Sequence, residues 1–336
     1  MENNKLAQLG FAFTRHRDDL QFYANHLSQQ QISDLEETVD HILEIIYLLF
    51  EKYGERGIPQ NHQSETFLNE IYAKIHKIRR AGLDKVADNM EKSVIEAIEN
   101  ENSFLKNFLS LISRAAILGI TFDAVTDIAQ YGIFNGGTIH SIFAFLADSD
   151  AARIHKAAVN AIKQTPGDLK VLRNAVKKEM GKTDNFVKSE IFNIVNGAVN
   201  DAALSIGARN NLKLIYSAVL DSSTCKHCRT LHGKVFDADD PGLPVIPAHS
   251  NCRCGYITLT SDIKQPEQMI LNFKDYIAGL DTQEQKKRLG KDKFQAWKDG
   301  LYALSDYEYP MQHQTLTIKQ LKKRDDEIFA RIEKLS

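Results

Sequence analysis

The sequence predicts an α+β protein, with a mainly helical N-terminal half followed by a small mixed module of short strands. Three observations support this prediction. Apolar residues recur at three- and four-residue steps through most of the chain, which is the period of an amphipathic helix. Short runs rich in strand-forming residues begin only after Gly207. The four cysteines, Cys225, Cys228, Cys252 and Cys254, all lie among these strands and are expected to staple the module.

The helical period is clearest near the N-terminus, where Leu35, Val39 and Ile42 line up on one face as the apolar stripe of a core. We expect helices to stop at glycines such as Gly82 and Gly181, because glycine is a poor helix former. In the first two thirds of the chain, the predicted helices are therefore at about 1–57, 65–80, 83–112, 151–163, 166–180 and 189–204.

Three short strands are predicted at 212–220, 234–236 and 256–259, because each run is apolar and rich in strand formers. Pro241, Pro244 and Pro247 keep the loop before the third strand extended. After Thr260 the pattern returns to helix, at about 267–279, at 282–299 and from 317 onward. We therefore expect a helical domain at 1–184, the mixed module at 185–310, and a helical C-terminal tail at 311–336.

The composition excludes several classes of protein. With 43% hydrophobic residues the chain has enough apolar side chains for sizeable cores. Its 42 basic and 44 acidic residues nearly balance, which argues against a dedicated nucleic-acid binder. The N-terminal MENNKLAQ lacks a secretory signal, and the most apolar run, 45–50, is too short to span a bilayer. We expect a protein made in a cytoplasm, where thiols stay reduced, with no membrane partner.

The cysteine spacing predicts a zinc site. Cys225 and Cys228 form a Cys-x-x-Cys pair, which lets two sulfurs reach one ion, and a second pair from a distant hairpin completes a tetrahedron. His249, three residues before Cys252, is an equally good ligand. The ligands are therefore either the four cysteines, or Cys225, Cys228, His249 and one of Cys252 and Cys254.

The same cysteines are also compatible with a disulfide bond or with reduced thiols that only pack. Catalysis is disfavoured because neither an H-x-E nor an H-E-x-x-H motif occurs in the chain. A thiol enzyme would need Cys228 or Cys252 with His249 and Asn251, which lie too close in sequence for a usual triad. The nearby His227 and His232 are interpreted as surface residues.

A cluster of basic residues at 286–293 suggests a further hypothesis, besides a structural protein and a metal- or thiol-dependent enzyme: a DNA-binding accessory factor. The side chains in question are Lys286, Lys287, Arg288, Lys291 and Lys293. Clusters of this kind are more often a solvated helix face than a phosphate-binding surface, so we rank this hypothesis below a structural role.

Two ordered motifs surround the cysteines: L-D-x-x-T-C-x-x-C-x-x-L-x-G-K-V-F at 220–236 and P-x-H-x-N-C-R-C at 247–254. They resemble the phage head morphogenesis family, whose namesake is the minor head protein F of phage Mu. L-G-K at 289–291, W-K-D-G at 297–300 and L-S-D at 304–306 are similar to the family's C-terminal stretch. The chain departs from the family at Ser223, where arginine is usual, and at 189–192, where a Thr/Arg-rich segment is usual.

The resemblance implies a minor capsid protein that acts in head assembly close to the portal and helps in DNA packaging or ejection. It implies as partners the portal protein and the major capsid or scaffolding protein, with packaged DNA as a further candidate. The helical domain at 1–184 is expected to dock on the portal or the inner capsid. It implies no enzyme activity, and a location in the virion head after assembly in the host cytoplasm. Zn²⁺ in a structural role is the expected cofactor.

Overall fold

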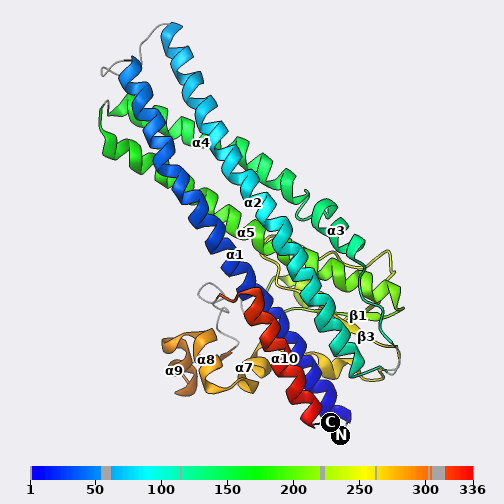
Figure 1. Ribbon diagram of the computed structural model, residues 1–336. Coiled ribbons are helices and arrows are strands. Elements are labelled where there is room, and N and C mark those ends of the chain that lie inside the picture. Colours follow the sequence, from blue (N-terminus) through cyan, green and yellow to red (C-terminus); the bar gives the residue numbers. More distant parts are fainter. Residues whose placement is uncertain are drawn as a thin grey trace. The chain divides into compact units, whose positions relative to one another are not determined.

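The structure is a computed structural model that describes residues 2–53, 62–113, 116–165, 167–219, 224–261, 263–301, 303–304 and 315–335. These residues are mostly helical and contain a three-stranded antiparallel sheet in the C-terminal half (Figure 1), which confirms the α+β prediction. The first four residues of the cysteine motif, 220–223, and residues 305 and 306 of the downstream stretch lie outside the described residues. Within the described chain, no helix combines the length and the apolarity needed to span a bilayer.

Long-range contacts divide the chain into two compact units, each assembled from several stretches. The sheet unit comprises residues 1–26, 93–135 and 192–336, and the helical unit comprises residues 27–92 and 136–191. The domain limits expected from the sequence, 184 and 310, remain a prediction. The helical unit is built from four long helices: α1 (Glu2–Tyr53), α2 (His62–Ser110), α4 (Ile139–Gln164) and α5 (Leu169–Arg209). Of these, α1, α2 and α5 also contribute to the sheet unit.

The core of the helical unit is an apolar cluster to which each of the four helices contributes one stripe of side chains. These stripes are Val39–Ile46, Phe67–Ile75, Ala151–Ile162 and Leu172–Met180.

The predicted helix ends at Gly82 and Gly181 are wrong, because α2 and α5 continue through these glycines. A glycine inside a helix costs only about 1 kcal/mol, which the packing of a long apolar face outweighs.

A charged pair lies inside the helical unit. The Arg79 guanidinium and the Asp150 carboxylate both have side chains with no exposed surface, and Nε donates to Oδ2 over 2.5 Å. Arg79 also donates to Thr38, and Asp150 accepts a hydrogen bond from Arg153. A buried charge is costly unless it is paired and hydrogen-bonded, so this contact favours one register of α2 against α4.

The sheet has the order β2-β1-β3, with β1 (Lys213–Ser217) at its centre. β2 (Val235–Asp237) and β3 (Gly255–Leu259) pair with it antiparallel, and Ile215 lies opposite Val235 on one side and Ile257 on the other. All residues of β3 are buried. The three strands lie where the sequence predicted them, and a short helix, α6 (Lys226–Leu231), was not predicted.

The remaining helices are short. α3 (Phe122–Tyr131) precedes α4, and a 3-10 turn (Pro266–Met269) and α7 (Phe273–Gly279) follow the sheet. The predicted helix at 282–299 is two helices, α8 (Thr282–Leu289) and α9 (Lys291–Lys298). Gly290 separates them with a φ of 79°, a left-handed conformation that glycine adopts at little cost. An apolar cluster that includes Phe273, Leu289 and Phe294 joins α7, α8 and α9.

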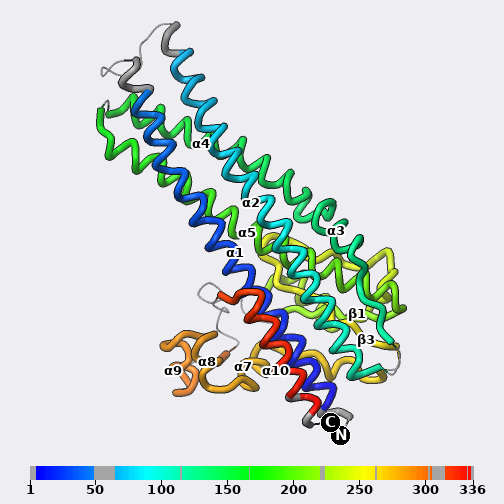
Figure 2. Tube along the Cα trace, in the orientation of Figure 1, coloured from blue at the N-terminus to red at the C-terminus, as the bar shows by residue number. Residues whose placement is uncertain are grey.

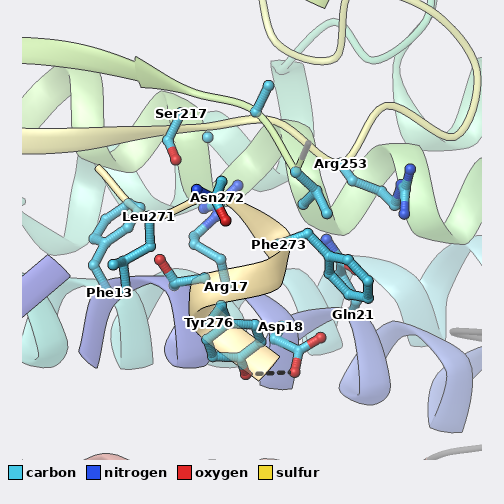
Figure 3. A pocket seen from close by; sticks show the side chains of 14 residues that line it. Phe13, Arg17, Asp18, Gln21, Ser217, Arg253, Leu271, Asn272, Phe273 and Tyr276 are labelled. Carbon is cyan, nitrogen blue, oxygen red and sulfur yellow. Dashed lines mark hydrogen bonds between the residues drawn. The ribbon is translucent and has the colours of Figure 1, made fainter. Parts of the chain in front are cut away.

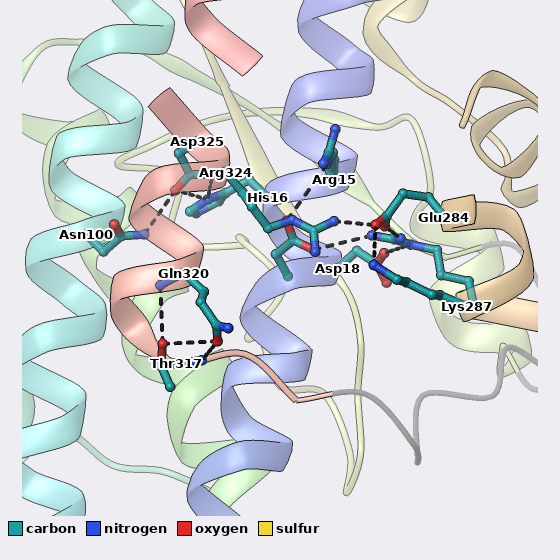
Figure 4. A network of polar contacts seen from close by, with 12 residues as sticks. Arg15, His16, Asp18, Asn100, Glu284, Lys287, Thr317, Gln320, Arg324 and Asp325 are labelled. Atoms are coloured by element: carbon teal, nitrogen blue, oxygen red, sulfur yellow. Dashed lines mark hydrogen bonds and ion pairs between the residues drawn. The ribbon is translucent and has the colours of Figure 1, made fainter. Parts of the chain in front are cut away.

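The C-terminal helix α10 (Ile318–Leu335) runs antiparallel to the first turns of α1 (Figure 2). Buried polar contacts hold it there (Figure 4). The two ring nitrogens of His16 lie 2.9 Å from Asp325 and 2.8 Å from Glu101, and the His16 ring stacks on Phe104. Arg324 pairs with Asp19 at 2.8 Å.

A second arginine extends this network toward α8. The side chain of Arg288 has no exposed surface, and its Nε donates to Asp18 over 2.6 Å. It also contacts Asp19 and Glu284. The first turns of α1 are thus surrounded by ionic contacts from α2, α8 and α10, all within the sheet unit.

Candidate metal centre

The structure brings all five predicted ligand residues together in the sheet unit. Cys225 caps the N-terminus of α6, where its sulfur accepts a hydrogen bond from the Cys228 N–H, and Cys228 lies in the first turn. His249 and Cys252 lie in the loop of residues 249–254, the chelating loop, and Cys254 immediately precedes β3. Cys228, Cys252 and Cys254 belong to one buried cluster with Tyr216 and Tyr256.

Three separations between donor atoms suit a tetrahedral ion, and the five donors fall into two overlapping groups of three instead of one group of four. His249 Nε2 lies 3.3 Å from Cys225 Sγ and 3.5 Å from Cys228 Sγ, and Cys228 Sγ lies 4.0 Å from Cys252 Sγ. Zinc bonds of about 2.3 Å to sulfur and about 2.0 Å to nitrogen give tetrahedral edges of roughly 3.5–3.8 Å. Two groups of three donors meet the distance requirement, and Cys228 belongs to both: Cys225–Cys228–His249 and Cys228–Cys252–Cys254.

The imidazole of His249 has the orientation that a ligand needs. Its Nδ1 lies 2.9 Å from the carbonyl oxygen of Ser250, and since a carbonyl only accepts, Nδ1 carries the proton. Nε2 is then left with its lone pair facing the two sulfurs. The hydrogen bond to Ser250 also raises the pKa of His249. A catalytic triad would instead place an Asn or Asp side chain at Nδ1.

Cys252 accepts a hydrogen bond from the thiol of Cys254. Hydrogen bonds from the Cys254 thiol and backbone N–H lower the pKa of Cys252 to about 5, although burial opposes this. The pKa of Cys254 is raised, because its thiol donates to Cys252 and is buried. Burial raises the pKa of Cys228 to about 11, and the Tyr216 hydroxyl donates to its sulfur over 3.4 Å.

The other candidates from the sequence lie outside this cluster. His227 is exposed, as predicted, whereas His232 is half-buried and its Nδ1 accepts the Ala218 N–H over 3.0 Å. In the basic cluster at 286–293, Arg288 is buried among carboxylates and cannot contact phosphate. Lys287 pairs with Glu284 at 3.3 Å. The surface that the DNA hypothesis relied on is therefore smaller than the sequence indicated.

A row of asparagines that sequence reasoning missed supports the chelating loop. Asn193, Asn196 and Asn200 lie on α5 with spacings of three and four residues, so they share one face. Each is less than a tenth exposed. One signal was available in the sequence: the three asparagines lie in a stretch of helix with few charged residues. A solvent-exposed helix face usually carries more charges than this stretch does.

Residues 152–257 match a protein family described as Phage Mu protein F like protein. The matched segment, about a third of the chain, contains the asparagine row, the sheet's first two strands and all five candidate ligands. Comparisons with curated proteins and with solved structures gave no match. The match agrees with the cysteine and histidine motifs at 220–254, and it indicates a protein of phage head morphogenesis. Residues 152–257 are thus a phage Mu protein F-like domain, in a chain whose ligand cluster lies within that domain.

Proposed function

We propose that this chain is a minor head protein of a tailed phage or prophage and that its phage Mu protein F-like domain contains a structural zinc ion. The family match at 152–257 is the observation that carries the first part. The convergence of five Cys and His side chains inside that same segment supports the second. The protein would act with other head components, in the virion.

Cys225, Cys228, His249 and Cys252 would hold the ion. They offer three thiolates and one neutral imidazole, which is a donor set that zinc favours in closed structural sites. Zinc contributes binding free energy that stabilises a small domain, on the order of 10 kcal/mol in isolated fingers. The sheet has only three short strands and a proline-containing loop, so it would gain much from such a contribution.

A structural role suits the site better than a catalytic one. Cys228 is 1% exposed and Cys252 is fully buried, so a substrate would not reach them. A catalytic zinc keeps one coordination position open to water or substrate, whereas four protein donors would close this one. The ion would therefore order the chelating loop and join it to α6.

We place the contact with the other head proteins, the portal or the major capsid or scaffolding protein, on the sheet unit around α3. Phe122, Tyr131 and Ile133 are 71%, 69% and 65% exposed, which is unusual for large apolar side chains. Phe122 and Tyr131 lie at the two ends of α3, and Ile133 lies two residues beyond it, so we infer that a partner contacts this helix and its flanks. Leu118, 55% exposed, lies just before the same helix.

Fractionation of an infected or induced host tests this proposal. The chain should co-sediment with procapsids and mature particles, and crosslinking should join it to the portal or another head protein. Substituting Phe122 and Tyr131 by serine should abolish incorporation without unfolding the protein. Exposed Phe145 in the helical unit, changed to serine, is the matched control. Absence of the chain from procapsids and virions alike would overturn the proposal.

A further inference from the structure

Side-chain amides of α5 hold the backbone of the chelating loop. Asn196 Nδ2 donates to the carbonyl of Cys252 over 2.7 Å and to that of Cys254 over 3.3 Å. Asn193 Oδ1 accepts the Asn251 N–H over 2.8 Å. Asn200 Oδ1 accepts the Tyr256 N–H over 3.1 Å. These contacts fix the direction of the loop on both sides of Cys252.

A buried arginine from α1 completes this arrangement. Arg17 is 7% exposed, and its Nη2 donates to Asn196 Oδ1 over 2.5 Å and to the Cys254 carbonyl over 3.2 Å. Gly255 permits this approach, because a Cβ there would lie 2.5 Å from Arg17 Nε. Figure 3 shows the side chain rising from α1 toward Asn272.

The charge of Arg17 lacks a direct partner. Among the described residues, no carboxylate lies within ion-pair distance of its guanidinium, and its Nη1 has no hydrogen-bond partner. This differs from Arg288, which contacts three carboxylates. Burial lowers the pKa of Arg17, and this lowering is opposed by Glu101, whose carboxylate is bonded to His16, and by the sulfurs of Cys254 and Cys252. A buried cation without a contacting anion is costly.

We propose that Arg17 and Asn196 are positioning residues of the metal centre. Asn196 holds the carbonyls of Cys252 and Cys254 and so directs Cys252 Sγ toward Cys228. Arg17 orients Asn196 and places a positive charge behind the ligands. Three thiolates around a dication leave one negative charge in excess, which this guanidinium offsets. The inference rests on the proposed zinc site and adds residues from α1 and α5 to it.

Metal affinity of the full-length protein tests the inference. Zn²⁺ affinity would be measured by competition with a chromogenic chelator, and the ligand field would be read from the absorption bands of Co²⁺. Loss of an outer-shell partner typically weakens metal binding 10–100-fold. We expect a loss of that size in Arg17→Met and in Asn196→Ala, with shifted Co²⁺ bands. Arg17→Lys, which keeps the charge, should recover part of the affinity.

Matched controls separate positioning from general destabilisation. Arg288→Met removes an equally buried arginine from the same unit, and Asn100→Ala removes an asparagine that donates to Asp325 instead of to the loop. Both should lower stability and leave Zn²⁺ affinity and Co²⁺ bands unchanged.

Each outcome decides a separate point. Wild-type affinity in Arg17→Met and Asn196→Ala, or an equal loss in the controls, would overturn the inference and leave the zinc site standing. If Arg17→Met does not fold, Asn196→Ala against Asn100→Ala decides alone. A wild-type protein that binds neither ion would instead overturn the proposed zinc site.

Discussion

His16 should make the stability of the sheet unit depend on pH in a way that one substitution removes. The imidazole is fully buried between Asp325 and Glu101. Burial alone would lower its pKa, but the two carboxylates outweigh burial and raise the pKa to about 9 from an ordinary 6.5. Since the folded protein binds this proton more tightly than the unfolded chain, the group stabilises the fold by about 3 kcal/mol below pH 6.5. That contribution is lost as the pH rises through 9.

The assay is urea unfolding between pH 6 and pH 10, followed by the fluorescence of Trp297, the chain's single tryptophan, which packs in the sheet unit. His16→Gln should be less stable than wild type by a few kcal/mol at pH 6, because two buried carboxylates then lack a cation. The difference should shrink toward pH 10. His76→Gln, in which the lost imidazole paired with Asp148 at the surface, should leave the pH dependence unchanged. A constant difference between wild type and His16→Gln across this range would refute the reasoning.

Three further predictions concern packing, a buried ion pair and the thiols. Leu321→Ala should lower the free energy of unfolding by about 2–5 kcal/mol, because Leu321 on α10 is fully buried, whereas the exposed Lys322→Ala should change it little; urea unfolding checks both. Asp150→Ala should lower the free energy of unfolding of the helical unit by roughly 3–5 kcal/mol, because the buried Arg79 cation then lacks its carboxylate partner. Faster amide hydrogen exchange at the ends of α2 and α4 should report this loss. Chelator treatment should make Cys225, the least buried cysteine, more reactive to alkylation in native buffer, as counted by mass spectrometry; equal labelling of Cys225 before and after would count against a bound metal.

Local patterns were enough to predict the strands and the ligand residues. The three strands were predictable because each is a short apolar run after a turn, and the ligands because Cys-x-x-Cys and His-x-x-Cys are chelating spacings. The α6 helix was not predicted because a helix of about one and a half turns is too short to show a repeat of apolar residues. Its start is set by the Cys225 sulfur as cap.

The residues that support the site could not be predicted, because their partners are distant in sequence. Arg17 donates to the carbonyl of Cys254, 237 residues away, and Asn196 donates to Cys252, 56 residues away. Asparagine and arginine on a helix are usually solvated, and nothing local distinguishes a buried one. Arg288 was wrongly predicted to be solvated for the same reason, because Lys286 and Lys287 next to it are exposed whereas Arg288 itself is buried.

The most direct test of the zinc site is the metal content of the full-length protein, purified without added metal. Elemental analysis should find about one zinc per chain, as expected for a closed tetrahedral site. Cys225→Ser, which removes the least buried of the cysteine ligands, should lower that content sharply and leave the helix content unchanged. A metal-free wild-type protein, or a Cys225→Ser variant that retains a full complement of zinc, would contradict the ligand set of Cys225, Cys228, His249 and Cys252.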